Sequence, residues 1–263
     1  MGGSLPQLSK GEVVRSSGVR RFAVPFSLAL TAFLLFPALP AVAATPPAEP
    51  VELGIEGGLI PCAVGPARPF VFTRAPQLSA RVSAGDGGFL DVGFRVLKGT
   101  AAAHTWDGNE QRVTDTPSGS FAQVTVAAGL IEDGQVYTWH MWAENSAGRA
   151  WSKFCEFEVD SVPPVAPEVS SPDYPEATVR PGPGKPGTFT FHANGSTDVP
   201  YYEYTFGDSS GPWTSAPATG LGGPASVTWV PPREGGYYLS VRSRDRAGNI
   251  SPTRQYGIRV LPA

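Results

Sequence analysis

The sequence predicts an all-β protein made of two tandem β-sandwiches behind an N-terminal export segment. Three observations carry this prediction. Charged residues make up only 16% of the 263 residues, and the chain holds 31 glycines and 28 prolines that separate many short apolar segments. These segments are rich in valine, threonine and aromatic residues and alternate between apolar and polar positions, which is typical of strands. One alternating stretch also recurs later in the chain, which predicts a duplicated module.

Residues 1–43 have the pattern of a signal peptide. Basic residues precede an apolar run at 22–39, and Ala41-Val42-Ala43 supplies the small-x-small site that signal peptidase cuts. An uncleaved membrane anchor is the alternative, but prolines inside the run and its alanine-rich end favour cleavage after Ala43. We therefore expect a secreted or cell-wall-associated protein that begins with a flexible segment at 44–57 and contacts a membrane only if the anchor stays.

The net charge excludes one class of partner. The chain has a formal net charge of −3, and loss of the export segment, with its four basic residues and one acidic residue, brings it to about −6. An acidic surface repels phosphate backbones, so nucleic acid is not expected as a partner.

Ten alternating segments predict the strands of the two sandwiches. They lie at 77–82, 90–97, 120–126, 136–143 and 153–159 in the first copy and at 187–193, 201–206, 225–230, 237–243 and 255–260 in the second. The predicted domains are 58–161 and 162–263. The proline-rich stretch 160–175 joins them as a semi-rigid linker and contains the first strand of the second domain.

The duplication is clearest in two matching segments. Residues 135–150 align with 235–250, so that Tyr137 falls on Tyr237, and each segment ends in an Asx-x-Ala-Gly turn. A repeat of this length predicts tandem domains rather than a solenoid.

Two cysteines, Cys62 and Cys155, are the only ones in the chain. In an exported protein such a pair predicts a disulfide, which would contribute ~4–5 kcal/mol in the chain-entropy model. Metal binding by two cysteines so far apart in sequence is a poor alternative. Cys62 lies near the start of the first copy and Cys155 in its last predicted strand, so the bridge is expected to tie the first strand to the last.

The stretch "LIEDGQVYTWHMWAENSAGRA" resembles the late part of a fibronectin type III (FnIII) or related immunoglobulin-like (Ig-like) domain. The resemblance implies that Tyr137 and Tyr237 are tyrosine-corner residues, whose hydroxyl groups bond back to the preceding turn. More narrowly, "GLIPCAVGPARP" and "SPDYPE" make the chain similar to tandem Ig-like modules of exported actinobacterial proteins, which often precede a LamG-like domain. Antibody domains carry a cysteine where this chain has Trp139.

Two short motifs are similar to the nucleophile and base motifs of trypsin-like serine proteases. Gly207–Pro212 holds Ser209, and "TAAAHT" holds His104. A catalytic pair needs both side chains within hydrogen-bond reach, yet the two residues fall in different predicted domains. We therefore interpret 207–212 as a polar turn, expect no enzymatic activity and no cofactor, and keep a serine hydrolase only as a remote alternative.

Carboxylates near predicted turns raise the question of calcium. Asp86, Asp91, Asp107 and Asp115 could hold it, but no dense Asp-x-Asx cluster is present, so no metal site is predicted. Glu156 and Glu158 alternate outward and predict a solvated face.

Aromatic residues give a weak signal for binding. His140 and Trp142 share the outward face of one predicted strand, and Trp151 follows the next turn. Exposed aromatic side chains can stack on sugars or anchor a protein; the favoured interpretation is that they pack under loops. We expect a non-catalytic structural, spacer or adhesion module, with an extracellular polysaccharide or protein as the alternative ligand of these three residues. The oligomeric state is not predicted.

Overall fold

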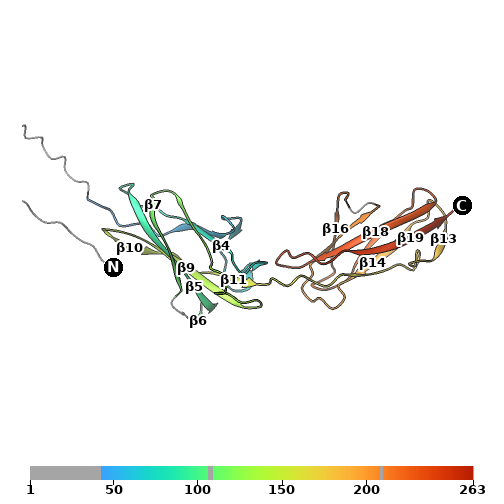
Figure 1. Cartoon of the computed structure of the whole chain (residues 1–263), viewed down its shortest axis with the longest axis horizontal. Helices are drawn as coiled ribbons and strands as arrows, with labels where there is room; N and C mark the ends of the chain where they lie inside the picture. The colour runs from blue at the N-terminus through green and yellow to red at the C-terminus, as the bar shows by residue number, and fades with distance from the viewer. Residues whose placement is uncertain (1–42, 106–108, 208–209, 263) are drawn as a thin grey trace, which may run out of the picture. The chain divides into compact units, whose positions relative to one another are not determined.

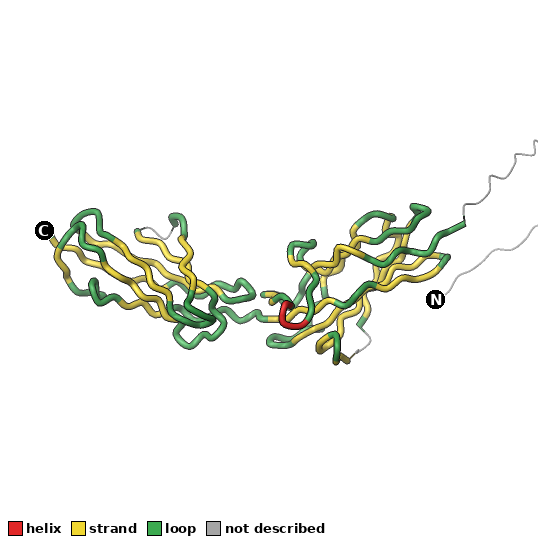
Figure 2. Tube along the Cα trace, turned by 180° about the vertical axis from the view of Figure 1, so that it is seen from behind, coloured by secondary structure: helices red, strands yellow, loops and turns green. Residues whose placement is uncertain are grey.

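A computed structural model describes residues 43–105, 109–207 and 210–262. The signal-peptide prediction for 1–43 therefore falls, apart from Ala43, outside the described residues. The described chain is almost entirely strand and loop, and its one helical element is a single 3-10 turn, η1 (Gly65–Ala67) (Figure 2). No helix in this part of the chain is long and apolar enough to cross a bilayer.

The first sandwich consists of two sheets with mostly antiparallel pairing. One has the order β2 (Ile60–Pro61), β1 (Val51–Ile55), β4 (Gln77–Arg81) and β8 (Phe121–Thr125). The other has the order β3 (Phe70–Val71), β11 (Cys155–Val159), β9 (Val136–Asn145), β5 (Phe89–Thr100) and β6 (Ala103–Thr105), with β7 (Glu110–Pro117) paired to β5 and β10 (Gly148–Trp151) paired to β9. Strand β3 runs parallel to β11.

The second sandwich repeats this plan (Figure 1). Its smaller sheet has the order β12 (Glu168–Ser170), β14 (Gly187–His192) and β17 (Ala225–Trp229). Its larger sheet has the order β13 (Val179–Pro181), β19 (Arg254–Leu261), β18 (Gly235–Arg244), β15 (Tyr201–Phe206) and β16 (Thr214–Pro217). In both copies one strand of the smaller sheet (β4 or β14) pairs with an earlier strand on one side and a later strand on the other, while the last two long strands pair with each other in the larger sheet. This is an Ig/FnIII-like arrangement, and the fold is all-β as predicted.

Each sandwich has its own hydrophobic core because alternate residues of every long strand point inward. In the first, Trp139 and Met141 of β9 pack with Phe94 of β5 and Phe157 of β11. In the second, the core forms around Phe189, Phe191, Tyr202 and other buried residues of β15, β18 and β19. These side chains are almost completely buried. The two cores are separate clusters.

The prediction that residues 44–57 form a flexible segment is wrong. Val51–Ile55 forms strand β1, which pairs with β4, and Leu53 and Ile55 are buried in the first core. The first sandwich therefore begins before residue 58. This strand is short and interrupted by Gly54, so its alternation is too weak to mark it. The ten predicted strands are all present, whereas edge strands such as β7, β10 and β16 lack an apolar face and were not predicted.

Candidate functional site

The predicted disulfide between Cys62 and Cys155 is confirmed, with Cα atoms 5.1 Å apart. Cys155 is buried at the start of β11, as expected. Cys62 follows β2 rather than lying in the first strand, which is β1. The bridge therefore ties the last strand of this sandwich to the segment that leads from β2 in one sheet to β3 in the other.

A buried carboxylate lies beside this bridge. Glu156 is only 3% exposed, which corrects the solvated face predicted for it. Its side chain accepts hydrogen bonds from the backbone N–H groups of Ala101 (2.7 Å) and Gly65 (2.8 Å) and from Arg68 (3.0 Å). Burial opposes ionisation of Glu156, but these donors outweigh it and hold its pKa below the usual value. Glu156 is thus a fastening point for three segments, and its contacts are structural.

Both corner tyrosines bond back to the turn before their own strand. The Tyr137 hydroxyl accepts a hydrogen bond from the backbone N–H of Glu132 at 2.8 Å. The Tyr237 hydroxyl instead donates to the backbone carbonyl of Arg233 at 2.9 Å. Each contact pins the turn to the penultimate strand of its sandwich.

The protease-like motifs are not brought together by anything in the described structure. His104 lies on β6, where its Nδ1 is 3.1 Å from the backbone oxygen of Thr100 and its ring packs against Phe154. Ser209 falls outside the described residues. Gly207, directly after β15, has a φ of +100°, a left-handed conformation that favours glycine.

Trp142 is buried and cannot stack on a ligand. This corrects the hypothesis that it is an exposed binding residue. It is 1% exposed. Its indole N–H donates to Glu110 at 3.0 Å, and the guanidinium groups of Arg149 and Arg112 lie 4.1 and 5.2 Å from its ring centroid. The ring also rests on Gly93 of the neighbouring strand, where an added Cβ would lie 2.3 Å from it. The outward face of β9 is therefore closed by cations and backbone.

His140 and Trp151 form a stack beside this closed surface. Their rings are 4.8 Å apart, and Phe154 lies 4.6 Å from His140 on the same stack. Trp151 is 38% exposed. Burial, with a contribution from the Arg95 charge, lowers the pKa of His140 to about 4. His140 is therefore neutral near pH 7, and its contacts are those of a packed aromatic side chain.

Three of the four aspartates considered for calcium line one depression of about 480 Å³ in the first sandwich. Asp86, Asp91 and Asp115 border it together with Glu144, while Asp107 lies outside the described residues. Asp86 accepts the backbone N–H of Thr45, and Asp91 accepts that of Asp115. Their carboxylates serve backbone donors, and they do not converge closely enough on one point to hold an ion.

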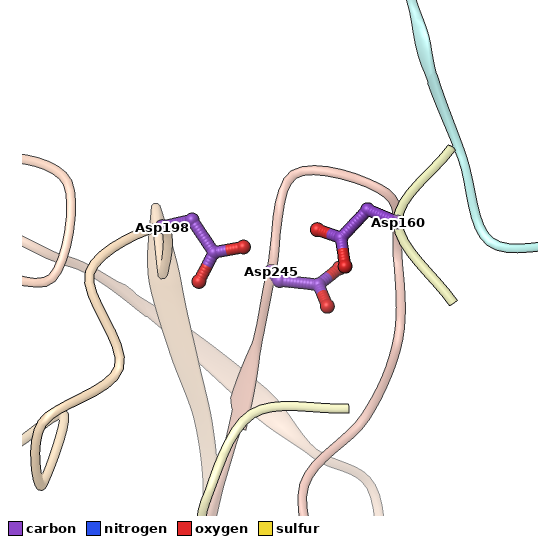
Figure 3. A group of neighbouring side chains, drawn as sticks. All are labelled: Asp160, Asp198 and Asp245. Carbon is purple, nitrogen blue, oxygen red and sulfur yellow. The ribbon is translucent and has the colours of Figure 1, made fainter. Parts of the chain in front are cut away.

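A different set of three aspartates does bring its carboxylate oxygens close together. Within the described residues, one set of acidic, histidine or cysteine side chains places its ligand atoms within 4.8 Å of one another: Asp160, Asp198 and Asp245 (Figure 3). Asp160 follows β11, Asp198 precedes β15, and Asp245 follows β18. No sequence motif marks this acidic trio, because its members lie on separate turns that only the fold brings together.

The acidic trio has unusual electrostatics. Asp245 is 3% exposed and accepts two hydrogen bonds from Asn249, through its backbone N–H and its side-chain amide, both at 2.8 Å. Burial, a hydrogen bond to Asp198 and the charges of Asp245 and Asp198 raise the pKa of Asp160 to about 6. Below that pH Asp160 is largely protonated, unlike an ordinary exposed aspartate. Carboxylate oxygens are also the ligands that Ca²⁺ and Mg²⁺ take.

Comparison with known proteins shows no family for this chain. No protein-family model matches the sequence, and no curated protein matches it. A solved structure of fibronectin(III)-like modules of CbhA from Clostridium thermocellum is similar to this chain, with a TM-score of 0.49 and 19% sequence identity. The similarity covers 80% of this chain and 95% of that chain.

Proposed function

We propose that this chain is a secreted, non-catalytic pair of sandwiches that acts as a structural spacer outside the cell. The observation that carries the proposal is the way the linker is fastened. Four linker groups between Asp160 and Ala166 are hydrogen-bonded by side chains of the second sandwich, so the connection is held rather than left to solvent.

The bonds reach successive linker residues. Asn249 donates its side-chain amide to the Asp160 carbonyl at 2.7 Å, and Asn194 donates to the Ala166 carbonyl at 3.1 Å. Val165 uses both of its backbone groups: its N–H donates to the Ser196 hydroxyl at 3.1 Å, and its carbonyl accepts from the Ser243 hydroxyl at 3.2 Å. Pro163 and Pro164 restrict the backbone between these bonds, and Pro167 restricts it directly after them. A linker with this composition and bonding is semi-rigid.

Secretion is part of the proposal. The N-terminal export pattern predicts it, and the Cys62–Cys155 disulfide supports it, because such bridges persist in oxidising compartments. In this proposal the chain lies at the cell surface or cell wall, as its sequence resemblance to modules of exported actinobacterial proteins implies, with a polysaccharide or protein as its neighbour. The aromatic residues of the first sandwich do not favour a ligand there, since Trp142 is buried.

The rigidity of the linker tests the proposal. Spin labels at Gln123→Cys and Thr228→Cys, both exposed strand positions in different sandwiches, report the distance distribution between the two domains. We expect a narrow distribution, which broadens when residues 160–167 are replaced by glycine and serine and broadens partly in Asn249→Ala. Asn145→Ala, which removes an amide that bonds Thr45 instead, is the matched control. A native distribution as broad as that of the glycine-serine variant contradicts a spacer.

The absence of catalysis is tested separately. The chain is exposed to a fluorophosphonate probe, which labels activated serine nucleophiles. We expect no labelling. Labelling that is lost in Ser209→Ala would establish a hydrolase and overturn this part of the proposal.

A further inference from the structure

Two glycines inside long strands of the second sandwich have no explanation in conformation or packing. Gly236 of β18 and Gly257 of β19 both lack a positive φ, so the backbone at these positions suits any residue. A Cβ atom added to either would meet no atom within 4 Å. Glycine inside a strand costs about 0.5–1 kcal/mol relative to alanine, and it often marks a place where a ligand approaches the backbone closely.

At two other strand glycines, Gly93 and Gly187, an aromatic ring fills this space. Tyr174 covers Gly187 in the second sandwich, where an added Cβ would lie 2.2 Å from the ring. Tyr238 is the cross-strand partner of Gly257, yet it leaves that glycine open. The Tyr238 side chain is 60% exposed, and its hydroxyl has no hydrogen bond to any described residue. The exposed Tyr238 ring therefore lies next to a stretch of strand backbone that no side chain covers.

Tyr238 and the two glycines line an open depression of about 780 Å³. Polar side chains form its border: Gln255 and Arg259 are exposed and have no side-chain hydrogen bond or ion pair among the described residues. Glu176 also borders it and holds Arg254 in an ion pair. We call this depression the glycine floor.

A second depression of about 600 Å³ shares Gln255 as a border residue with the glycine floor. This neighbour is lined by Trp213, Arg242 and Arg254, and the Arg242 guanidinium lies 4.1 Å from the Trp213 ring centroid. Two aromatic residues with planar polar groups between them thus follow the outer face of one sheet. Such a surface fits a ligand longer than one ring.

The strands themselves restrict what the occupant is. Strands β18 and β19 pair with each other inside a five-stranded sheet (Figure 1), and on its other side β19 pairs with β13 only over Arg259–Leu261, while the Gly257 N–H donates to the Glu176 carboxylate at 3.4 Å. The glycine floor is a face of the sheet and offers methylene groups and a ring face. Because a peptide strand adds at a sheet edge, it cannot add as a further strand on this face. A pyranose ring suits this chemistry, since its C–H face stacks on an aromatic ring and its hydroxyl groups bond amide and guanidinium groups at the border.

We propose that the glycine floor binds a pyranose ring of a polysaccharide, stacked on Tyr238 and bonded by Gln255 and Arg259, with the next part of the glycan chain running toward Trp213. This site is in the second sandwich, away from the aromatic residues that the sequence singled out in the first. It does not depend on the spacer function, because a stiff or a mobile linker leaves this face of the sheet unchanged.

The test is a titration of the full ¹⁵N-labelled chain with cellohexaose, xylohexaose and chitohexaose, followed by amide chemical shifts. We expect at least one hexasaccharide to shift the amides of Gly236, Tyr238 and Gly257 and to bind with a Kd of about 1 mM or tighter. Tyr238→Ala should weaken binding at least about tenfold, the loss of one stacking contact. Phe89→Ala, which removes an equally exposed aromatic residue of the first sandwich (66% exposed), should leave it unchanged.

Gly257→Val separates a ligand site from a folding role. A side chain at this position fills the floor, so binding should fall at least about tenfold while the Tm stays the same or rises. A lower Tm in this variant would show that the glycine serves folding and would overturn the proposal. The absence of shifts with all three hexasaccharides at about 5 mM would overturn it as well, and so would shifts at these amides caused only by a proline-rich peptide, which would assign the face to a protein.

Discussion

Each sandwich contains a cross-strand pair of a glycine and an aromatic residue, and the two pairs differ in how far they are covered by other side chains. In the first, Trp142 lies on Gly93 and is sealed by Arg112 and Arg149. In the second, Tyr238 faces Gly257 across the strands but stays exposed and leaves the glycine open. The same pairing therefore closes one surface and leaves the other accessible. The first sandwich is also locked by a disulfide, whereas the second has none.

The largest difference between the two sandwiches should follow from reduction of the disulfide. The Cys62–Cys155 bridge closes a sequence separation of 93 residues within the first sandwich, and the chain-entropy model gives it ~4–5 kcal/mol. Calorimetry with and without reductant should show a lower Tm for the first sandwich and nearly no change for the second. A Cys62→Ala, Cys155→Ala variant, which should not respond to reductant, is the control. Equal shifts of both transitions would contradict this assignment.

The next effect should come from adding one methyl group to the closed pair. In Gly93→Ala the new Cβ would clash with the Trp142 ring, which must shift and lose its cover. We expect the free energy of unfolding to fall by about 1–3 kcal/mol, the usual cost of overpacking. Urea unfolding measures it. Gly93→Ala should cost much less in a Trp142→Leu background, and an equal cost in both backgrounds would show that the ring is not the cause.

A smaller difference is expected in the pH dependence of the two sandwiches. The pKa of His140 is lowered to about 4, so the first sandwich should gain stability as pH rises from about 4 to 6.5, because the unfolded chain binds more protons there. The pKa of Asp160 is raised to about 6, so the fastening of the linker to the second sandwich should lose stability as pH rises from about 4 to 6. Separate Tm values measured against pH should slope in opposite directions, and Asp160→Asn should flatten only the second slope. Parallel slopes in the native chain would rule out these assignments.

Alternation and turn-forming residues were enough to predict the ten strands that build the two cores, because half-buried strands must alternate to build a core. The same rule placed Trp142 correctly on the outward face of β9, but it did not predict that Trp142 is buried. That burial depends on Arg112, Arg149 and Gly93, which reach it from other strands in a register that the sequence does not show. An outward position in a strand is thus not the same as an exposed one.

The candidate sites were harder to predict for the same reason. The acidic trio comes from three connecting segments that are far apart in the sequence. Asp160, Asp198 and Asp245 each look like ordinary loop residues there. The glycine floor arises from the pairing of β18 with β19, and Gly257 alone looks like a weak point in a strand pattern. Only the disulfide could be predicted directly, because the chain contains just two cysteines.

The smallest expected effect is the change in stability in Gly257→Ala, and it tests most directly whether the Gly257–Tyr238 pair is open while the Gly93–Trp142 pair is closed. Gly257→Ala adds the same methyl group as Gly93→Ala, at a matching cross-strand position, but into open space. We expect the free energy of unfolding to rise by up to about 0.5–1 kcal/mol, since alanine restricts the unfolded chain without straining this extended backbone. Urea unfolding under the same conditions as for Gly93→Ala measures it. A loss of stability as large as that of Gly93→Ala would mean that Tyr238 covers its glycine in solution, and the distinction between a closed and an open pair would fail.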